Sequence, residues 1–251
     1  MGWYYDSHVH LSDPLYANDL NSIVLGMQQI NLKACCVSTN IDDSKNTLRL
    51  AKSTSLILPF IGIHPEYFEN DLNQMTELID KNHKCISGIG EIGLDPTYSK
   101  SEDDCKKQTH VFENLLSLAE KYQKPVSIHS RKSLDNIFEI MTSYNTKQAL
   151  LHWFDGSKKQ LQKAMDMDFF VSYGPVTIYA NDKQTLLSKT NKSKILIETD
   201  GPVRFSGCFE LKPAHVFFIP SIIFCASKIL GMSFDDLTVL LEENSKSYLG
   251  I

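Results

Sequence analysis

Two histidines, His8 and His10, stand two positions apart in an apolar stretch near the start of the chain. If this stretch is a strand, both imidazoles point to the same side, because successive strand side chains alternate between faces. Two imidazoles on one rigid element can hold a divalent cation. A lone His-x-His pair is more often an ordinary polar strand end, so a metal site requires ligands from elsewhere in the chain.

Further groups of suitable type follow other apolar runs of the sequence. They are Glu91, His129, His152 and Asp200. Together with the first pair they make six groups, and burying these at one place would be costly without a charge that neutralises the carboxylates. A pair of divalent cations supplies that charge, so the sequence predicts a two-metal centre.

The six groups divide between the two cations. We expect His8, His10 and Asp200 to hold one cation and His129 and His152 to hold the other, with Glu91 bridging the two. Mixed imidazole and carboxylate ligands favour Zn, Mn or Co, and Mg is a further candidate for the ion that supports catalysis. Two such ions ~3.5–4 Å apart would stabilise both the entering and the leaving oxygen in a hydrolysis.

Several neighbouring residues are candidates for supporting roles. Asp200 is the predicted proton acceptor, since it would touch both a cation and the reacting water. His64 is predicted either to contact the substrate or to bond into a strand-end turn. Arg131 would hold a phosphate or carboxylate, or pair with Glu198. We expect Glu198 to be structural, and Asp95 to act as a cap unless it orients a ligand.

The elements that must position these groups recur as short apolar runs, each followed by an amphipathic stretch. The predicted strands are Trp3–His8, Lys33–Ser38, Leu56–Ile63, Cys85–Gly90, Pro125–His129, Ala149–His152, Phe169–Tyr173 and Lys194–Glu198. The predicted helices are Leu15–Ile30, Asp43–Ser53, Asp71–Asn82, Asp104–Lys121, Lys132–Tyr144, Ser157–Met167, Asn181–Lys189, Pro213–Leu230 and Phe234–Tyr248.

Eight such units in 251 residues predict a single (β/α)₈ barrel of the TIM type spanning residues 1–251. Continuous rather than alternating apolar runs are typical of parallel strands covered on both faces. The active site would then lie at the carboxyl ends of the strands. A doubly wound open sheet is the alternative. The Gly-x-Gly-x-x-Gly match from Gly88 to Gly93 is attributed to close backbone packing, because no helix opens at these glycines.

Composition limits the remaining possibilities. The net charge of −5 argues against a general basic surface for nucleic acids, although a local basic cleft stays compatible with it. No stretch is long and apolar enough to predict a membrane span. The six cysteines contain no Cys-x-x-Cys pair, so we expect reduced, mostly buried thiols and a cytoplasmic protein. The oligomeric state is left open, and a monomer is compatible with the sequence.

Six motifs in this order resemble the TatD-related metal-dependent hydrolases of the amidohydrolase superfamily. They are Asp6-Ser7-His8-Val9-His10, Gly62-Ile63-His64-Pro65, Gly90-Glu91-Ile92-Gly93-Leu94-Asp95, Ile128-His129-Ser130-Arg131, the His152–Ser157 segment and Glu198-Thr199-Asp200-Gly201-Pro202. The resemblance implies a barrel, a divalent metal centre held by the six groups above, and often deoxyribonuclease activity. It also implies substrate contacts for His64 and Arg131.

The chain departs from that family pattern around the expected substrate mouth. Trp153 stands where cysteine is usual, Gly201 where alanine is usual, and the stretch Val203–Pro213 replaces an aromatic-rich segment. We therefore expect hydrolysis of phosphodiester bonds in DNA, and as the alternative hydrolysis of a small ester, lactone, amide or phosphoester by the same centre. A metal-binding scaffold without catalysis is a further hypothesis, which predicts no metal-dependent turnover.

Overall fold

The computed structural model describes residues 2–146 and 148–251, and its centre is one parallel sheet of eight strands. The strands are β1 Tyr4–Val9, β2 Leu32–Val37, β3 Ile57–Ile61, β4 Gly88–Gly93, β5 Val126–His129, β6 Ala149–Leu151, β7 Phe170–Tyr173 and β8 Ile195–Ile197. Each strand pairs in parallel with the next one along the chain. The predicted barrel is confirmed, with a sheet that is nearly closed, and the open-sheet alternative is wrong.

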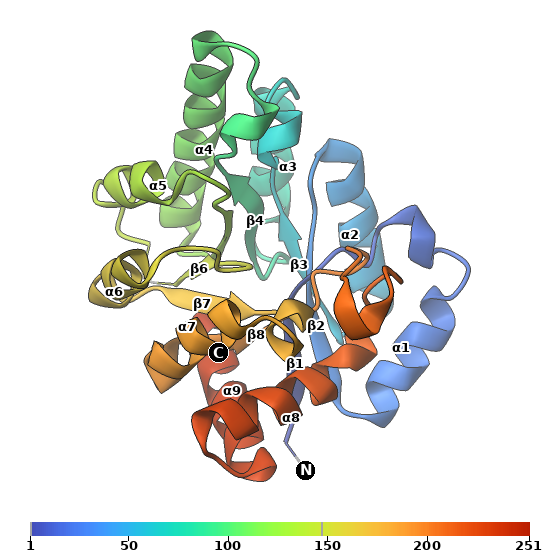
Figure 1. Ribbon diagram of the computed structural model, residues 1–251. Helices are drawn as coiled ribbons and strands as arrows, with labels where there is room; N and C mark the ends of the chain where they lie inside the picture. The colour runs from blue at the N-terminus through green and yellow to red at the C-terminus, as the bar shows by residue number, and fades with distance from the viewer. Residues whose placement is uncertain (1, 147) are drawn as a thin grey trace.

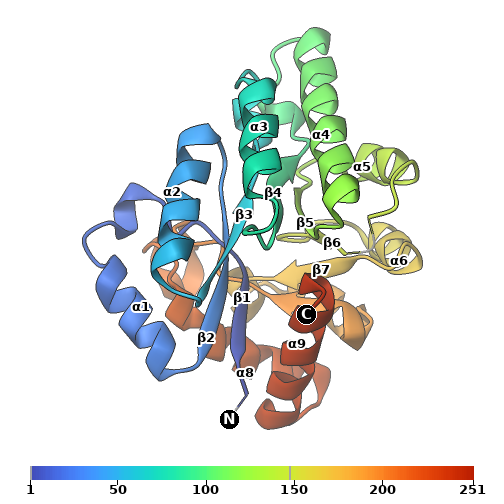
Figure 2. The same cartoon turned by 180° about the vertical axis from the view of Figure 1, so that it is seen from behind.

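Helices surround this sheet on its outer face, as Figures 1 and 2 show from opposite sides. They are α1 Leu20–Gln29, α2 Ile41–Ser53, α3 Leu72–Asn82, α4 Glu102–Tyr122, α5 Leu134–Met141, α6 Lys158–Asp166, α7 Asn181–Lys189, α8 Ile219–Leu230 and α9 Phe234–Leu249. Short 3₁₀ turns beginning at a proline follow four of the strands: Pro14–Tyr16, Pro65–Tyr67, Pro96–Tyr98 and Pro175–Ile178. Proline suits the first position of such turns because its fixed φ is already helical.

Three of the predicted ranges were wrong in ways that matter for the site. The fourth strand runs from Gly88 to Gly93, so Glu91 lies within it rather than after it. The first predicted helix is broken between Tyr16 and Leu20. The α-helix predicted from 213 begins only at Ile219, with a proline in its first turn, and a 3₁₀ turn at Val216–Phe218 directly precedes it.

The two ends of the sheet meet at a seam between β1 and β8, where no backbone ladder joins the described strands. Side chains and strand ends make the connection instead. Ser7 Oγ donates to the Ile197 carbonyl at 2.9 Å, and the Thr199 amide donates to Asp6 Oδ1 at 3.0 Å. Beyond them the Asp200 amide donates to the carbonyl of His8 at 2.9 Å. The seam therefore holds two of the predicted ligands, His8 and Asp200, next to each other.

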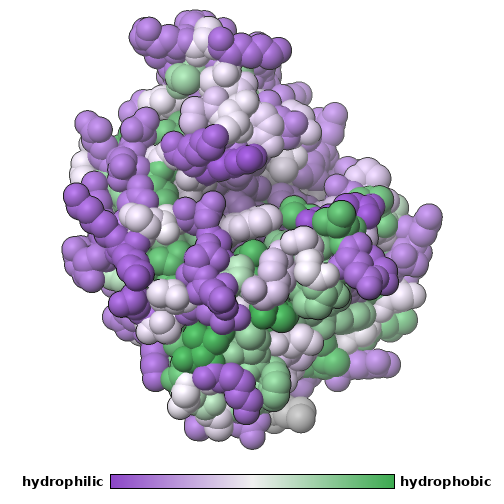
Figure 3. Space-filling view, in the orientation of Figure 1, coloured by the Kyte–Doolittle hydropathy of each residue, from purple (hydrophilic) through white to green (hydrophobic). Residues whose placement is uncertain are grey.

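Apolar side chains fill both sides of the strands. The inner cluster contains Tyr5, Cys35, Val37, Phe60, Leu150, Phe170 and Leu196, together with Tyr248 from α9. A larger cluster lies between the strands and the helices. Figure 3 shows that hydrophilic side chains prevail over the upper part of one face, while hydrophobic ones gather over its lower part, around α8.

The cysteines differ from expectation in their burial. All six are free, and Cys35 and Cys36 are buried in β2, but Cys85, Cys105 and Cys208 are exposed. These three lie outside the strands of the structure, although Cys85 opens the apolar run that was predicted as the fourth strand. Within the described ranges no single helix could span a membrane by length and hydropathy. The pair 216–230 and 234–249 passes this test together but is bent by 108°.

Candidate metal centre

A cavity of about 920 Å³ opens at the carboxyl ends of the strands. Five of the six predicted ligands line it, and they are His10, Glu91, His129, His152 and Asp200. The sixth, His8, lies completely buried beneath them. The structure thus brings all six side chains together, although their segments are spread over almost 200 positions. The roles of these side chains as metal ligands remain predictions.

Glu91 stands at the centre of the cluster, and its two oxygens face different groups of imidazoles. Oε1 lies 2.8 Å from His152 Nε2 and 2.9 Å from His129 Nδ1. Oε2 lies 3.4 Å from His8 Nε2 and 3.5 Å from His10 Nε2. The surrounding imidazoles hold the pKa of this carboxyl well below its usual range, although burial opposes them. A charged carboxylate with this division can bridge two cations.

The first group of donors fits a cation. Asp200 Oδ1 lies 3.7 Å from His8 Nε2 and 3.5 Å from His10 Nε2. Metal–ligand distances of about 2.0–2.2 Å in a tetrahedral site place neighbouring ligand atoms roughly 3.3–3.6 Å apart. Among the described residues, His8 Nε2 is buried without a hydrogen-bond partner. An orphaned, buried nitrogen that faces two carboxylates at these separations is suited to ligate a metal.

The second nitrogens of two imidazoles are held by the protein. His8 Nδ1 lies 2.8 Å from the Ser127 hydroxyl, and His129 Nε2 lies 3.0 Å from Asp95 Oδ2. Partners of this kind fix the tautomer and orientation of metal-ligating histidines. Asp95 also accepts the Thr97 amide, so it both caps the turn at 96–98 and orients His129. The sequence could have indicated Ser127, which shares a strand face with His129 two residues on.

Burial and neighbouring charges shift the pKa values of these imidazoles in opposite directions. Burial by itself would lower the pKa of His10, but Asp200 and Glu91 raise it to about 9. The same balance, with Asp95 and Glu91 as partners, raises the pKa of His129 to about 9. Burial lowers the pKa of His8 to about 4, and His152 adds to this effect. The centre is therefore a site where carboxylates attract positive charge into a buried space.

His64 lies closer to the cluster than its place in the sequence suggested. Its Nε2 is 3.3 Å from His129 Nδ1 and 3.5 Å from Glu91 Oε1, and these three residues could also hold a cation. However, His64 Nδ1 accepts the Glu66 amide at 3.1 Å. Burial lowers the pKa of His64 to about 4, so the ring is neutral at pH 7. A neutral ring that accepts at Nδ1 carries its proton at Nε2, and it therefore presents a donor to the cavity.

Arg131 and Glu198 do not pair with each other. The strand ends at His129, so the expected shared face does not extend to Arg131, which is exposed and lines the cavity. Glu198 is buried and accepts hydrogen bonds from the Trp153 amide at 2.7 Å and from the Ser172 hydroxyl. Burial raises the pKa of Glu198 well above its usual value. Arg131 is thus free to meet a ligand.

The segment that departs from the family pattern folds against the cavity wall. Arg204 and Pro213 form an antiparallel bridge that closes the loop. Phe205 of this loop packs on Trp153 with ring centroids 5.1 Å apart, and Trp153 lines the cavity. The loop therefore places an aromatic wall beside the candidate centre.

Comparisons with known proteins identify the family of this chain. The model of the family described as TatD related DNase matches residues 5–250. An uncharacterized metal-dependent hydrolase of Haemophilus influenzae is 30% identical over 211 residues, with 81% of this chain and 82% of the relative covered. The human deoxyribonuclease TATDN3 is 26% identical and covers 78% of this chain and 77% of its own length.

A solved structure shows the same fold. The crystal structure of the Escherichia coli TatD homologue YJJV superposes with a TM-score of 0.90 at 21% identity, over 99% of this chain and 98% of that one. Candidate metal-binding groups are present at the cavity, and the family match spans nearly the whole chain. The chain therefore belongs to the TatD-related DNase family of metal-dependent hydrolases.

Proposed function

We propose that this protein hydrolyses phosphodiester bonds in DNA with the help of two divalent cations. The observation that carries the proposal is the division of Glu91, whose two oxygens face two separate groups of imidazoles. His8, His10 and Asp200 would hold one cation, and His129 and His152 the other. Bound divalent cations lower the pKa of water and stabilise the charge that develops on a phosphate.

The residues of the chain itself would bind the substrate and move protons. Asp200 lines the cavity, and its Oδ1 lies near His8 of β1 and near His10 directly after it, so it is placed to accept a proton from the attacking water. His64 Nε2–H would donate a hydrogen bond to a phosphate oxygen. Arg131, at the exposed rim, would pair with the same phosphate or with its neighbour.

A second candidate function is hydrolysis of a small ester, lactone, amide or phosphoester. The observation that favours it is the charge of the cavity wall outside the centre. The described lining contains the carboxylates of Asp13, Asp43, Glu66 and Asp155 but a single Lys or Arg side chain, that of Arg131. DNA-binding proteins usually contact several phosphates with Lys and Arg. This wall suits a ligand with one or two negative charges better than a long polyanion.

One experiment separates the two candidates. Metal-free protein is titrated with Mn, Mg, Zn and Co while cleavage of end-labelled single- and double-stranded DNA is followed, beside a panel of small esters, lactones and phosphodiesters. Metal-dependent release of nucleotides supports the first candidate. Turnover of small substrates alone supports the second. Metal binding without turnover of any substrate would contradict both and favour a non-catalytic scaffold.

Two further proposals concern the whole chain. We propose that residues 1–251 form one domain, because a single sheet collects strands from 4 to 197 and α9 packs on β1 and β8. We also propose a cytoplasmic location, which the exposed free thiols of Cys85, Cys105 and Cys208 support. Fractionation of cells and the redox state of these thiols would test the second proposal.

A further inference from the structure

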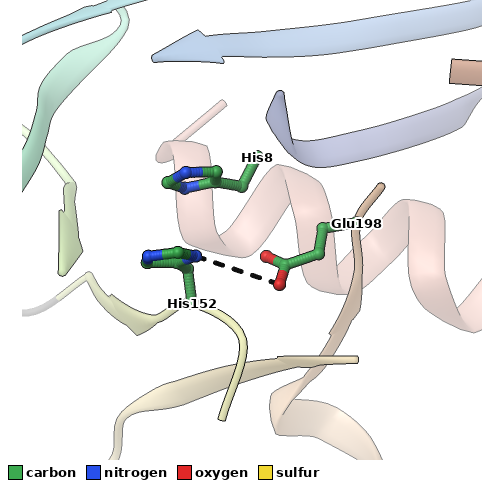
Figure 4. Close-up of side chains that lie close together, drawn as sticks. All are labelled: His8, His152 and Glu198. Carbon is green, nitrogen blue, oxygen red and sulfur yellow. Dashed lines mark ion pairs between the residues drawn. The ribbon is translucent and has the colours of Figure 1, made fainter. Parts of the chain in front are cut away.

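Glu198 lies directly after β8, beneath the candidate metal centre, and is fully buried. Figure 4 shows its carboxylate facing the edge of the His152 ring. Oε1 accepts the Trp153 amide at 2.7 Å, and Oε2 accepts the Ser172 hydroxyl at 2.5 Å. Two donors from β7 and from the turn after β6 therefore fix the carboxylate in one orientation.

His152 differs from His8 and His129 in the state of its second nitrogen. Its Nε2 faces Glu91, but its Nδ1 is buried and has no hydrogen-bond partner within the described part of the chain. Glu198 Oε1 lies 4.0 Å from this Nδ1. The His152 ring also stacks on that of His8, with centroids 3.8 Å apart and planes within 8°. This stacking restrains the tilt of the His152 ring. Among the described residues, no hydrogen bond fixes the direction of its Nδ1.

We propose that Glu198 is a positioning residue for His152: its carboxyl accepts the Nδ1–H, so that the Nε2 lone pair points at the cation-binding side of Glu91. A ligating histidine usually donates its other ring N–H to a carboxylate or carbonyl, which fixes its tautomer. For this hydrogen bond to form, the 4.0 Å between Glu198 Oε1 and His152 Nδ1 must shorten by about 1 Å, to the roughly 3 Å of an N–H···O bond.

The same carboxyl links the metal centre to the substrate wall. Trp153 follows His152 directly and has a left-handed backbone with φ of 41°, which is uncommon for a bulky residue. Its amide donates to Glu198 Oε1, and its side chain lines the cavity. Glu198 thus holds the turn that carries both a predicted ligand and the aromatic wall.

The test compares divalent-cation affinity among three variants. Glu198→Met removes both acceptor oxygens at similar size, and we expect titration calorimetry with Zn²⁺ or Mn²⁺ to show affinity weakened about 10–100-fold. Glu198→Gln keeps an acceptor at Oε1, and we expect it to restore affinity close to that of the parent. Ser172→Ala removes the donor to Oε2 and a second acceptor of the Trp153 amide but leaves Oε1 in place. As the matched control it should weaken cation affinity much less than Glu198→Met does.

A merely structural role predicts a different pattern, in which Glu198→Met lowers the melting temperature but binds cations as tightly as the parent. That result would overturn the proposal. Nitrogen NMR of the metal-loaded parent tests it without any variant. A protected Nδ1–H on His152 is expected, and an Nε2–H tautomer would refute the positioning role.

This inference rests on the proposed metal centre but not on its substrate. A parent protein that binds no divalent cation would refute the centre and this role together. Binding that is equal in the parent and in Glu198→Met would refute the role of Glu198 alone.

Tryptophan emission in a Trp3→Phe background reports the surroundings of Trp153 in the cavity wall, since Trp153 is then the single tryptophan. We expect a red shift in Glu198→Met, and the parent spectrum in Glu198→Gln.

Discussion

Replacing Asp6 by asparagine should remove a pH dependence of stability that the seam of the barrel creates. Asp6 is fully buried in β1 and accepts the amide of Thr199 at 3.0 Å and that of His8 at 3.3 Å. The Thr199 hydroxyl donates to its other oxygen. Asparagine can accept the same two amides and donate to the threonine oxygen, so Asp6→Asn changes the charge while keeping the connections.

The sign follows from the direction of the pKa shift. Burial raises the pKa of Asp6 from 3.8 to about 7, although the hydrogen bonds from Thr199 and His8 oppose the rise. Between these values the folded state binds a proton that the unfolded state has released. The contribution of Asp6 to the free energy of unfolding is therefore greatest below about pH 4, and it is lost as the pH rises through 7. A rise of about three units corresponds to roughly 4 kcal/mol at most.

Urea unfolding of the metal-free protein at several pH values between 4 and 8 measures this contribution. The free energy of unfolding of the parent should fall, relative to that of Asp6→Asn, by an amount on the order of 2–4 kcal/mol across the range. Asp42→Asn on the exposed first turn of α2 is the matched control, and its free energy of unfolding should depend on pH as that of the parent does. If Asp6→Asn shows the same pH dependence as the parent, or a difference of the opposite sign, the reasoning is refuted.

Three further predictions concern the centre. Asp200→Asn should keep the circular-dichroism spectrum and abolish turnover, and full activity would contradict its role as proton acceptor. Arg131→Gln should raise KM for phosphate substrates and leave KM for a neutral ester unchanged, as initial rates would show. Gly93→Ala should cost more than about 2 kcal/mol in urea unfolding, since φ is 148° and its Cβ would lie 2.0 Å from the His129 carbonyl oxygen. Stability equal to the parent would contradict this steric argument.

The sequence was sufficient for the architecture because parallel strands buried on both faces leave continuous apolar runs. Seven of the eight predicted runs contain most of a strand in the structure, and the fourth contains half of β4. The convergence of the six polar groups also followed from the sequence, because the carboxyl ends of barrel strands must meet at one mouth. Gly88, Gly90 and Gly93 face neighbouring strands too closely to carry a Cβ, as the packing interpretation of the glycine motif predicts.

Which partner meets which ligand could not be predicted in the same way. Periodicity places Ser127 on the strand face of His129, but that its hydroxyl meets His8, and that Asp95 orients His129 besides capping a turn, depends on side-chain rotation across neighbouring strands. The boundaries of α1 and α8 also failed, because the chain before each helix is fixed by contacts at the mouth. One such contact is the Tyr16 hydroxyl donating to the Ala214 carbonyl at 2.5 Å.

The seam also explains why a metal would matter for this fold as well as for catalysis. β1 and β8 are neighbours without a backbone ladder, and Asp6 and Thr199, which join them, are 193 residues apart. His8 and His10 stand on one side of this seam and Asp200 on the other. A cation held by these three residues would bridge the two ends of the sheet, which no backbone ladder joins among the described residues. Metal binding would then add its free energy to barrel closure itself.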